Sequence, residues 1–286
     1  VPYEFVEVVR GVGNSPNAAV AASRLGLSSG LITDIGADLN GRECLDSLKS
    51  NGVNTDYVTR HQEEETNYHY VLWYEEERTI LVKHHEYDYR FPEAPAPQWL
   101  YLSSLAENSL PYHKEIVLYL KKNPGTKLAF QPGTFQIKLG YENLSELYRL
   151  STLFFCNKDE AQRILKSDSE NIKELLKGIR SLGPKIAVIT DGPAGAYTYN
   201  GEEMWHMPMY PDPKRPVDRT GAGDAFASTF TSALVLGKDV PTALSWGPVN
   251  SMSVVQEIGA QKGLLSRAKL EGLLRDAPAD YKPRRI

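Results

Sequence analysis

The sequence predicts an α/β fold in which helices cover a largely parallel sheet. From residue 14 onward, short apolar runs alternate with helix-length segments, the order expected when crossover helices connect parallel strands. The chain has 286 residues, 41% of them hydrophobic and 24% charged, which is enough to bury the core of one large domain. We therefore expect a single domain over 1–286 and exclude a disordered or fibrous chain.

The first helix is expected over 14–25. Asn14 or Ser15 can cap it, Pro16 suits its first turn and Gly26 ends it. A second helix is expected from 38 or 40 to 50, and another over 225–236. Short apolar segments predict strands at 29–35, 99–102, 127–130, 152–156 and 185–190.

Residues 66–85 differ from the rest of the chain. Four large side chains share one parity, a turn with three glutamates and an arginine follows, and extended character resumes over 79–82; the four are Tyr68, Tyr70, Leu72 and Tyr74. The pattern predicts a β-hairpin set apart from the parallel sheet. Its aromatic face fits either ordinary sheet packing or a lid over a ligand, and periodicity does not decide between them.

Charge and cysteine content exclude several classes of function. The chain has 32 basic and 36 acidic residues, a formal net charge of −4 and no pronounced basic block, so nucleic acid and anionic membranes are poor candidate partners. The two cysteines, Cys44 and Cys156, predict neither a disulfide scaffold nor a structural zinc site. Without a long apolar run or a leader pattern, we expect a soluble, cytoplasmic protein.

The strongest chemical motif is the run Asp-Arg-Thr-Gly-Ala-Gly-Asp-Ala-Phe at 218–226. A glycine-rich turn at a helix start leaves N–H groups uncovered, and these favour an anion such as phosphate. The carboxylate of Asp224 would repel phosphate, which points to a second role, accepting a proton from an attacking hydroxyl. Taken alone, the motif fits a tight turn with a helix-capping aspartate equally well.

Three further motifs occur in the same chain: Gly-Asn-Ser-Pro-Asn-Ala-Ala at 13–19, Asn-Lys-Asp-Glu at 157–160 and Thr-Asp-Gly-Pro-Ala-Gly-Ala at 190–196. With these motifs in this order, the sequence resembles the PfkB, or ribokinase-like, carbohydrate kinase family over nearly its whole length. The resemblance implies a three-layer α/β/α sandwich with a mostly parallel central sheet and a small β lid. It also implies an ATP-dependent kinase acting on a sugar or a nucleoside.

The resemblance assigns the catalytic machinery. Asp224 matches the family's catalytic base, and Gly221, Ala222 and Gly223 match its anion hole. This agrees with the physical interpretation, since phosphoryl transfer needs positioning and charge stabilisation more than covalent chemistry.

Asn157 and Glu160 match the family's NxxE motif, in which the glutamate helps to organise Mg²⁺ and its waters beside the phosphates. Their spacing places both side chains on one helix face. Without the family pattern, the same four residues would read as a helix cap with acidic residues in the first turn.

The nucleotide side is also implied by the resemblance. Thr190, Gly192 and Gly195 match a loop that approaches the ATP phosphates and ribose, where close approach requires glycine. The segment 250–263, beginning at Asn250, resembles the adenine-side region. Its backbone is also where a monovalent cation such as K⁺ can bind.

On the acceptor side, Gly13, Asn14 and Asn17 match the family's sugar-binding GGxxxN motif, in which amides both donate to and accept from hydroxyl groups. Val12 departs from this pattern where the first glycine would stand. Arg219 departs from the signature by replacing a small residue. Gln131 follows a predicted strand, and ligands bind at the carboxyl ends of strands in such sheets, so it is a further acceptor candidate beside a plain turn.

The family also has an upstream strand that contributes an acceptor-binding aspartate, and the sequence begins after it at Val1. We expect a truncated sequence on that ground. The leading functional hypothesis is an ATP-dependent carbohydrate kinase. The alternatives are an adenosine-type nucleoside kinase and a nucleotide-binding protein without catalysis. Family lids often form dimer contacts, so a homodimer through the hairpin and a monomer both stay open.

Overall fold

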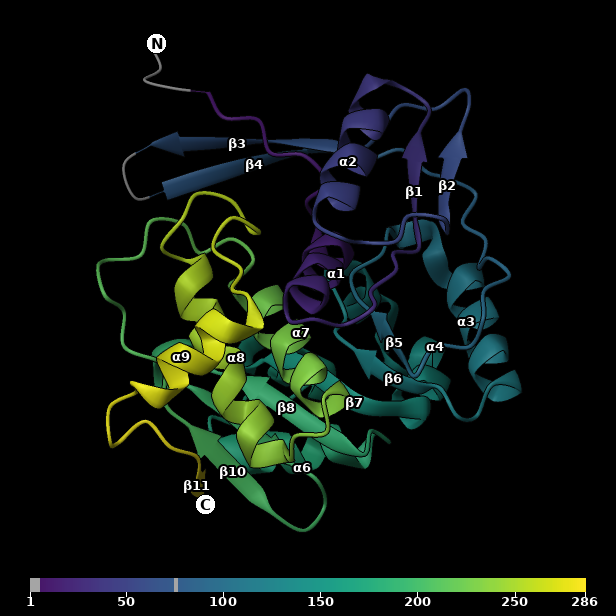
Figure 1. The fold of residues 1–286 in the computed structure, drawn as a ribbon. Helices are drawn as coiled ribbons and strands as arrows, with labels where there is room; N and C mark the ends of the chain where they lie inside the picture. Colours follow the sequence, from purple (N-terminus) through teal and green to yellow (C-terminus); the bar gives the residue numbers. More distant parts are fainter. Residues whose placement is uncertain (1–5, 75–76) are drawn as a thin grey trace.

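A central sheet of seven strands organises the computed structural model, which describes residues 6–74 and 77–286 (Figure 1). Its strand order is β11-β10-β9-β8-β7-β6-β5. Strands β5 to β8 run parallel, and β9, β10 and β11 continue the sheet in antiparallel pairs. The strand bounds are β5 Trp99–Leu102, β6 Lys127–Phe130, β7 Ser151–Asn157, β8 Ile186–Thr190, β9 Ala196–Tyr199, β10 Met204–Met207 and β11 Arg284–Arg285. The predicted α/β class is thereby confirmed.

Helices cover both faces of this sheet. The larger ones are α1 Asn14–Arg24, α2 Leu39–Ser50, α3 Leu110–Lys122, α4 Thr134–Leu150, α5 Lys158–Leu165, α6 Ile172–Ser181, α7 Ala222–Val235, α8 Val240–Val254 and α9 Arg267–Arg275. Within the described residues, none of these helices combines the length and apolar character needed to cross a membrane.

Alternation along the strands decides which layer each side chain joins. On β7, Leu153 and Phe155 belong to the core shared with α7, α8 and α9. Phe154 and Cys156, on the opposite face, belong to the core shared with α3, α4, α5 and α6. Because successive side chains of a strand point to opposite faces, one apolar run supplies both cores, and the three layers follow.

Two smaller pieces of β structure lie apart from the sheet. Strand β1, Thr33–Gly36, pairs in parallel with β2, Val58–His61. The segment predicted as strand 29–35 therefore starts later than expected and joins a sheet of its own. Strands β3, Tyr68–Tyr74, and β4, Glu77–Lys83, form an antiparallel hairpin. The turn predicted between them includes 75–76, which lie outside the described residues.

A third apolar cluster ties this outer part to the body of the protein. Val20 on α1 and Leu48 on α2 pack in one cluster with Ala225 on α7. The first turn of α7 is thus held between α1 and the sheet-covering helices, at the same edge as the carboxyl ends of β6, β7 and β8 (Figure 1). In open α/β sheets this edge is where ligands bind.

A buried hydrogen-bond network fixes the loops after β5 and β6. Nδ1 of His113 on α3 lies 2.7 Å from the Ser109 carbonyl oxygen, so it donates there, and Nε2 accepts from Nε2 of Gln136 at 2.9 Å. Gln136 also donates to the Ser103 carbonyl and accepts from the Gly133 N–H group. Burial lowers the pKa of His113 to about 4, so the imidazole is neutral in the folded protein at neutral pH.

This network predicts a specific loss of stability in acid. His113 has a pKa of about 4 when folded and about 6.5 when unfolded, so the unfolded state takes up the proton first. The free energy of unfolding should fall as the pH drops from 6.5 through 4, with His113 contributing up to about 3 kcal/mol of that loss. Urea unfolding across this range should show a shallower decline for His113→Gln than for the parent. His206→Gln, which removes an imidazole from β10, should keep the parent's decline; equal slopes for His113→Gln and the parent would contradict the assignment.

Candidate active site

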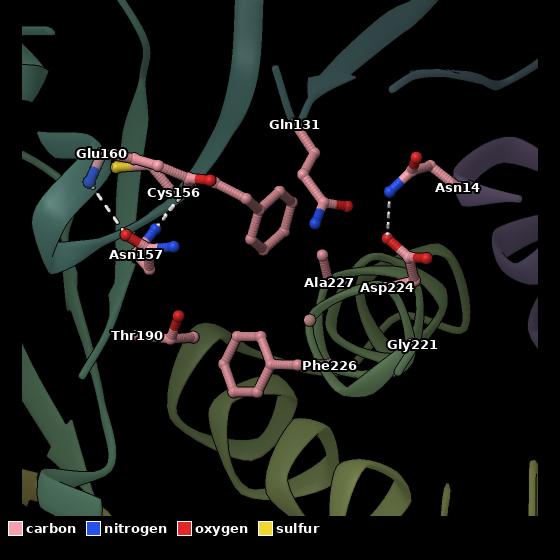
Figure 2. Close-up of a pocket in the computed structure, with 12 residues that line it drawn as sticks. Asn14, Gln131, Cys156, Asn157, Glu160, Thr190, Gly221, Asp224, Phe226 and Ala227 are labelled. Atoms are coloured by element: carbon pink, nitrogen blue, oxygen red, sulfur yellow. Dashed lines mark hydrogen bonds between the residues drawn. The ribbon is translucent and has the colours of Figure 1, made fainter. Parts of the chain in front are cut away.

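A pocket of about 250 Å³ opens at the carboxyl ends of β6, β7 and β8, across from the start of α7 (Figure 2). Its lining residues are Asn14, Gln131, Phe155, Cys156, Asn157, Glu160, Thr190, Gly221, Gly223, Asp224, Phe226 and Ala227. Eight of the residues predicted from the sequence are therefore brought to one pocket: Asn14, Gln131, Asn157, Glu160, Thr190, Gly221, Gly223 and Asp224.

The carboxylate of Asp224 is the most constrained group in the pocket. It lies in the first turn of α7 and is only 7% exposed. Nδ2 of Asn14 donates to its Oδ1 at 2.9 Å, and Nδ2 of Asn17 donates to its Oδ2 at 2.9 Å. Burial raises the pKa of Asp224 above its ordinary value, and the two amide hydrogen bonds act against that shift. A buried carboxylate with a raised pKa, facing a pocket, is suited to accept a proton.

The glycine turn before Asp224 is shaped by close packing. Gly221 has a φ of +81°, a conformation that other residues rarely adopt, and a Cβ atom there would lie 2.4 Å from Cβ of Ala260. Beside it, Gly223 is exposed, and a Cβ atom would meet Nε2 of Gln131 at 3.7 Å. The N–H groups of Gly223 and Asp224 belong to the first helical turn, which has no intrahelical acceptors to offer them. The turn thus presents N–H groups and the positive end of α7 at the pocket.

Asn157 and Glu160 are placed by the junction of β7 and α5. Oδ1 of Asn157 accepts from the Glu160 N–H group and Oε2 of Glu160 accepts from the Asn157 N–H group, each at 2.8 Å. This is a reciprocal capping box, so the helix-cap interpretation describes the local geometry. Both side chains also line the pocket, opposite Asp224 (Figure 2). Burial raises the pKa of Glu160.

The residues predicted for the nucleotide divide into two groups. Thr190 lines the pocket at the end of β8. Gly192 has a φ of +46° and open space where a Cβ would stand, whereas a Cβ on Gly195 would lie 2.2 Å from the Met207 carbonyl oxygen. Gly195 therefore allows β10 to approach. The side chain of Asn250 is fully buried, donating to Oγ1 of Thr229 and accepting from the Leu265 N–H group, so it has no exposed surface for a nucleotide.

On the acceptor side, Gln131 lines the same pocket as Asp224, and its side chain extends toward the start of α7 (Figure 2). The Tyr101 hydroxyl on β5 donates to its Oε1, which leaves the amide nitrogen to face the pocket. Gly13 is the N-cap of α1 with a φ of +146°. The two departures from the family pattern, Val12 and Arg219, both have exposed side chains.

Several pocket residues were not among those predicted from the sequence. Phe155, Phe226 and Ala227 add apolar side chains to the pocket lining, and Cys156 precedes Asn157 at the strand end. Tyr101 acts through Gln131. Strand alternation carried a signal for Phe155, which shares parity with Asn157. The Tyr101 contact joins two strands and has no local signal.

Comparison with known proteins gives a consistent result. The pfkB family carbohydrate kinase description matches residues 6–267. Ribokinase from Bacillus subtilis is 28% identical, covering 92% of this chain and 87% of that protein. Nucleoside kinase from Methanothermobacter thermautotrophicus is 25% identical, covering 88% of this chain and 80% of that protein. The structure of Arabidopsis thaliana ribokinase complexed with ribose and ATP has the same fold, with a TM-score of 0.77 and 19% identity, covering 96% and 93% of the two chains.

The packing of the glycine turn leads to a stability prediction. Gly221→Ala should cost about 1–2 kcal/mol for its positive φ, plus about 1–3 kcal/mol for overpacking against Ala260. Gly237→Ala is the matched control, because Gly237 has a φ of +79° with no atom within 4 Å of a Cβ position. Urea unfolding should therefore show Gly221→Ala to be clearly the more destabilised. Equal losses in the two variants would mean that the contact with Ala260 relaxes freely.

Proposed function

The chain belongs to the pfkB family of carbohydrate kinases, and we propose that it transfers the γ-phosphate of ATP to a hydroxyl group of a sugar or sugar-like alcohol. The observation that carries this proposal is the Asp224 carboxylate, buried at the helix start and held by two amides at the edge of the pocket. A residue that only bound phosphate would not be an anion. A general base is the role that explains a carboxylate in this place.

The two oxygens of Asp224 have different surroundings. Oδ2 accepts from Asn17, which is only 4% exposed, whereas Oδ1 accepts from Asn14, which lines the pocket. In the proposed reaction Oδ1 of Asp224 takes the proton of the acceptor hydroxyl while the hydroxyl oxygen attacks the γ-phosphorus of ATP. The bond from the γ-phosphorus to the β–γ bridging oxygen breaks, and ADP leaves with that oxygen. Asn14 is then near enough to hold the same acceptor, since its amide can both donate to and accept from hydroxyl groups.

During the transfer, negative charge is carried by the oxygens of the phosphoryl group. The exposed Gly223 and the N–H groups of the first turn of α7 suit these oxygens, because the dipole end favours an anion and Gly223 has no side chain of its own to cover them. Asn157 and Glu160, opposite Asp224 in the pocket, would hold Mg²⁺ through oxygen ligands and its waters. The ion, when bound, neutralises charge on the transferring phosphate. Thr190 borders the same space.

Polar amides favour an acceptor rich in hydroxyl groups. Asn14 and Gln131 lie on the side of the pocket nearest Asp224 (Figure 2), and the pocket, at about 250 Å³, suits the reacting ends of two substrates. The relatives include both ribokinase and nucleoside kinase. A nucleoside is therefore the second acceptor class to be tested. The proposal places the enzyme in the cytoplasm, which supplies ATP.

A homodimer formed through the hairpin β3–β4 is the second part of the proposal. Tyr70 and Leu81, paired across the hairpin, are 60% and 51% exposed, and Val71 and Ile80, on the opposite face, are 45% and 42% exposed. A two-stranded hairpin with apolar side chains on both faces is marginally stable alone and is a typical interaction surface. A second copy of the hairpin would cover one of these faces.

The kinase proposal predicts acceptor-dependent ADP release with Mg·ATP. The assay compares pentoses, hexoses and nucleosides, with potassium chloride present because the proposal includes a monovalent cation bound by the backbone of segment 250–263. Asp224→Asn should lower kcat by about 10²–10⁴-fold, the usual contribution of a general base. In the parent, kcat/KM should fall as acid protonates Asp224, at a pH above the ordinary aspartate pKa of about 3.9.

Asp239→Asn is the matched control, because Asp239 caps α8 by accepting from the Thr242 N–H group, and asparagine caps equally well. It should keep the parent's kcat. ADP release with nucleosides but with none of the sugars would make a nucleoside the acceptor instead of a sugar. ATP binding without ADP release for any acceptor would favour a nucleotide-binding protein, and full activity of Asp224→Asn would refute the assigned base.

The dimer proposal predicts a change of mass. Light scattering after gel filtration should give a dimer for the parent and a monomer for Leu81→Glu, since a charge in an apolar interface is costly. Leu118→Glu is the control, because Leu118 on α3 is 66% exposed and lies outside the hairpin. A parent that elutes as a monomer at tens of micromolar would disprove the contact.

A further inference from the structure

The loop after α8 reaches across the molecule with one buried amide. Gln261 is 6% exposed, and its Nε2 atom donates to the Gly11 carbonyl oxygen at 2.7 Å and to Oδ1 of Asn17 at 3.1 Å. Both of its amide hydrogens are therefore committed to residues just before and within α1. The sequence resemblance assigned this segment to the adenine side, so the contact with the acceptor side is a finding of the structure.

The direction of these hydrogen bonds is fixed at both ends. The Gly11 carbonyl can only accept, which sets the amide nitrogen of Gln261 toward it. Oδ1 of Asn17 then accepts from Gln261 and, at 3.4 Å, from the Gly13 N–H group. Nδ2 of Asn17 is left to donate to Oδ2 of Asp224, which as a carboxylate oxygen can only accept. Reversing the Asn17 amide would place oxygen against carboxylate and N–H against N–H.

The loop that carries Gln261 is itself held in place. Nη1 of Arg24, at the end of α1, donates to the carbonyl oxygens of Gln261 and Leu264 at 2.7 and 2.8 Å. Ala260 contacts the glycine turn, as shown by the 2.4 Å separation that a Cβ on Gly221 would have from it. Because these contacts fix the backbone of the loop, the Gln261 side chain starts from a fixed position.

We infer that Gln261 is a positioning residue for the base: it orients the Asn17 amide so that the N–H group of Asn17 faces Asp224. It touches no substrate, and it acts through Asn17 on Oδ2, leaving Oδ1 toward the pocket. For the transfer reaction, this inference rests on the proposed function. The effect of Gln261 on the hydrogen bonds of Asp224 does not depend on the proposed function.

Two substitutions separate hydrogen bonding from packing. Gln261→Met keeps an unbranched side chain of similar size and removes both donated hydrogen bonds. Gln261→Glu keeps the shape and, when ionised, offers only acceptors to Gly11 and Asn17. Gln256→Met is the matched control, because Gln256 is also buried, at 9% exposure, near the end of α8, and its Nε2 atom donates to Asp212 instead.

Kinetics give the first readout. For Gln261→Met we expect kcat to fall at least tenfold, with KM for ATP within twofold of the parent, and for Gln261→Glu we expect a larger loss despite its conserved shape. Gln256→Met should keep the parent's kcat. A loss in Gln261→Met no greater than in Gln256→Met, or parent-like activity of Gln261→Glu, would overturn the inference.

A second readout does not require activity. The carboxyl ¹³C resonance of Asp224, assigned by its loss in Asp224→Asn, reports its titration directly. Its midpoint should move to higher pH in Gln261→Met, since a misoriented Asn17 no longer donates to Oδ2. The charge of Asp224 also acts on Tyr101, but burial raises the pKa of Tyr101 well above its ordinary value, so Tyr101 does not titrate in acid. Glu160 lines the same pocket, and the assignment through Asp224→Asn separates its resonance from that of Asp224.

The two readouts distinguish the inference from the proposed function. A shifted midpoint in a protein whose parent turns over no acceptor would support the role of Gln261 and refute the kinase proposal. If the parent is an active kinase and the Asp224 midpoint is unshifted in Gln261→Met, the role of Gln261 is refuted and the kinase proposal stands. Far-ultraviolet circular dichroism identifies a variant that fails to fold, and Gln261→Glu then carries the test.

Discussion

The cost of burying one carboxylate organises this molecule. Removing an ion from water costs several kcal/mol unless hydrogen bonds replace the lost hydration. Asp224 obtains those bonds from Asn14 and Asn17, which precede it by 210 and 207 residues. The helix that opens the chain must therefore lie against the helix that carries the carboxylate. The apolar cluster containing Val20 and Ala225 supplies the packing that holds them together.

The sheet supplies the opposite side of the pocket. Because β6, β7 and β8 run parallel, their last residues meet at one edge, and Gln131, Asn157 and Thr190 arrive there from separate parts of the sequence. The metal-binding candidates lie on regular elements, where a capping box fixes Asn157 and Glu160 before any ion binds. Groups held in this way need little reorganisation when a substrate enters.

Sequence reasoning succeeded where the determining contacts are local. Strands at 99–102 and 127–130 match the structure because their apolar runs are bounded by turns. Helix α7 begins at Ala222 rather than 225, since Gly221 is its N-cap and Gly223 already lies in its first turn. Segment 29–35 was predicted as one more strand of the alternating pattern, and pairing partners are not encoded in a single segment.

The same limit applies to the candidate site. Eight of the predicted residues line the pocket because motif spacing reflects strand ends and helix starts. Asn250 could not be placed correctly by motif, since its partners Thr229 and Leu265 are set by how α7 and α8 pack. Gln261 lies 244 positions from Asn17, and no periodicity connects them.

The alternation of side chains along β7 also limits where insertions and deletions can be tolerated in this protein. Phe155 and Asn157 share parity, which directs Asn157 toward the face that holds α7. Inserting or deleting a single residue within β7 would reverse the faces beyond that point, sending Asn157 to the wrong layer and a core aromatic to the pocket. Such a chain would keep its composition and lose its site. Length variation in descendants of this sequence should therefore collect in surface loops, and be absent from the strands that end at the pocket.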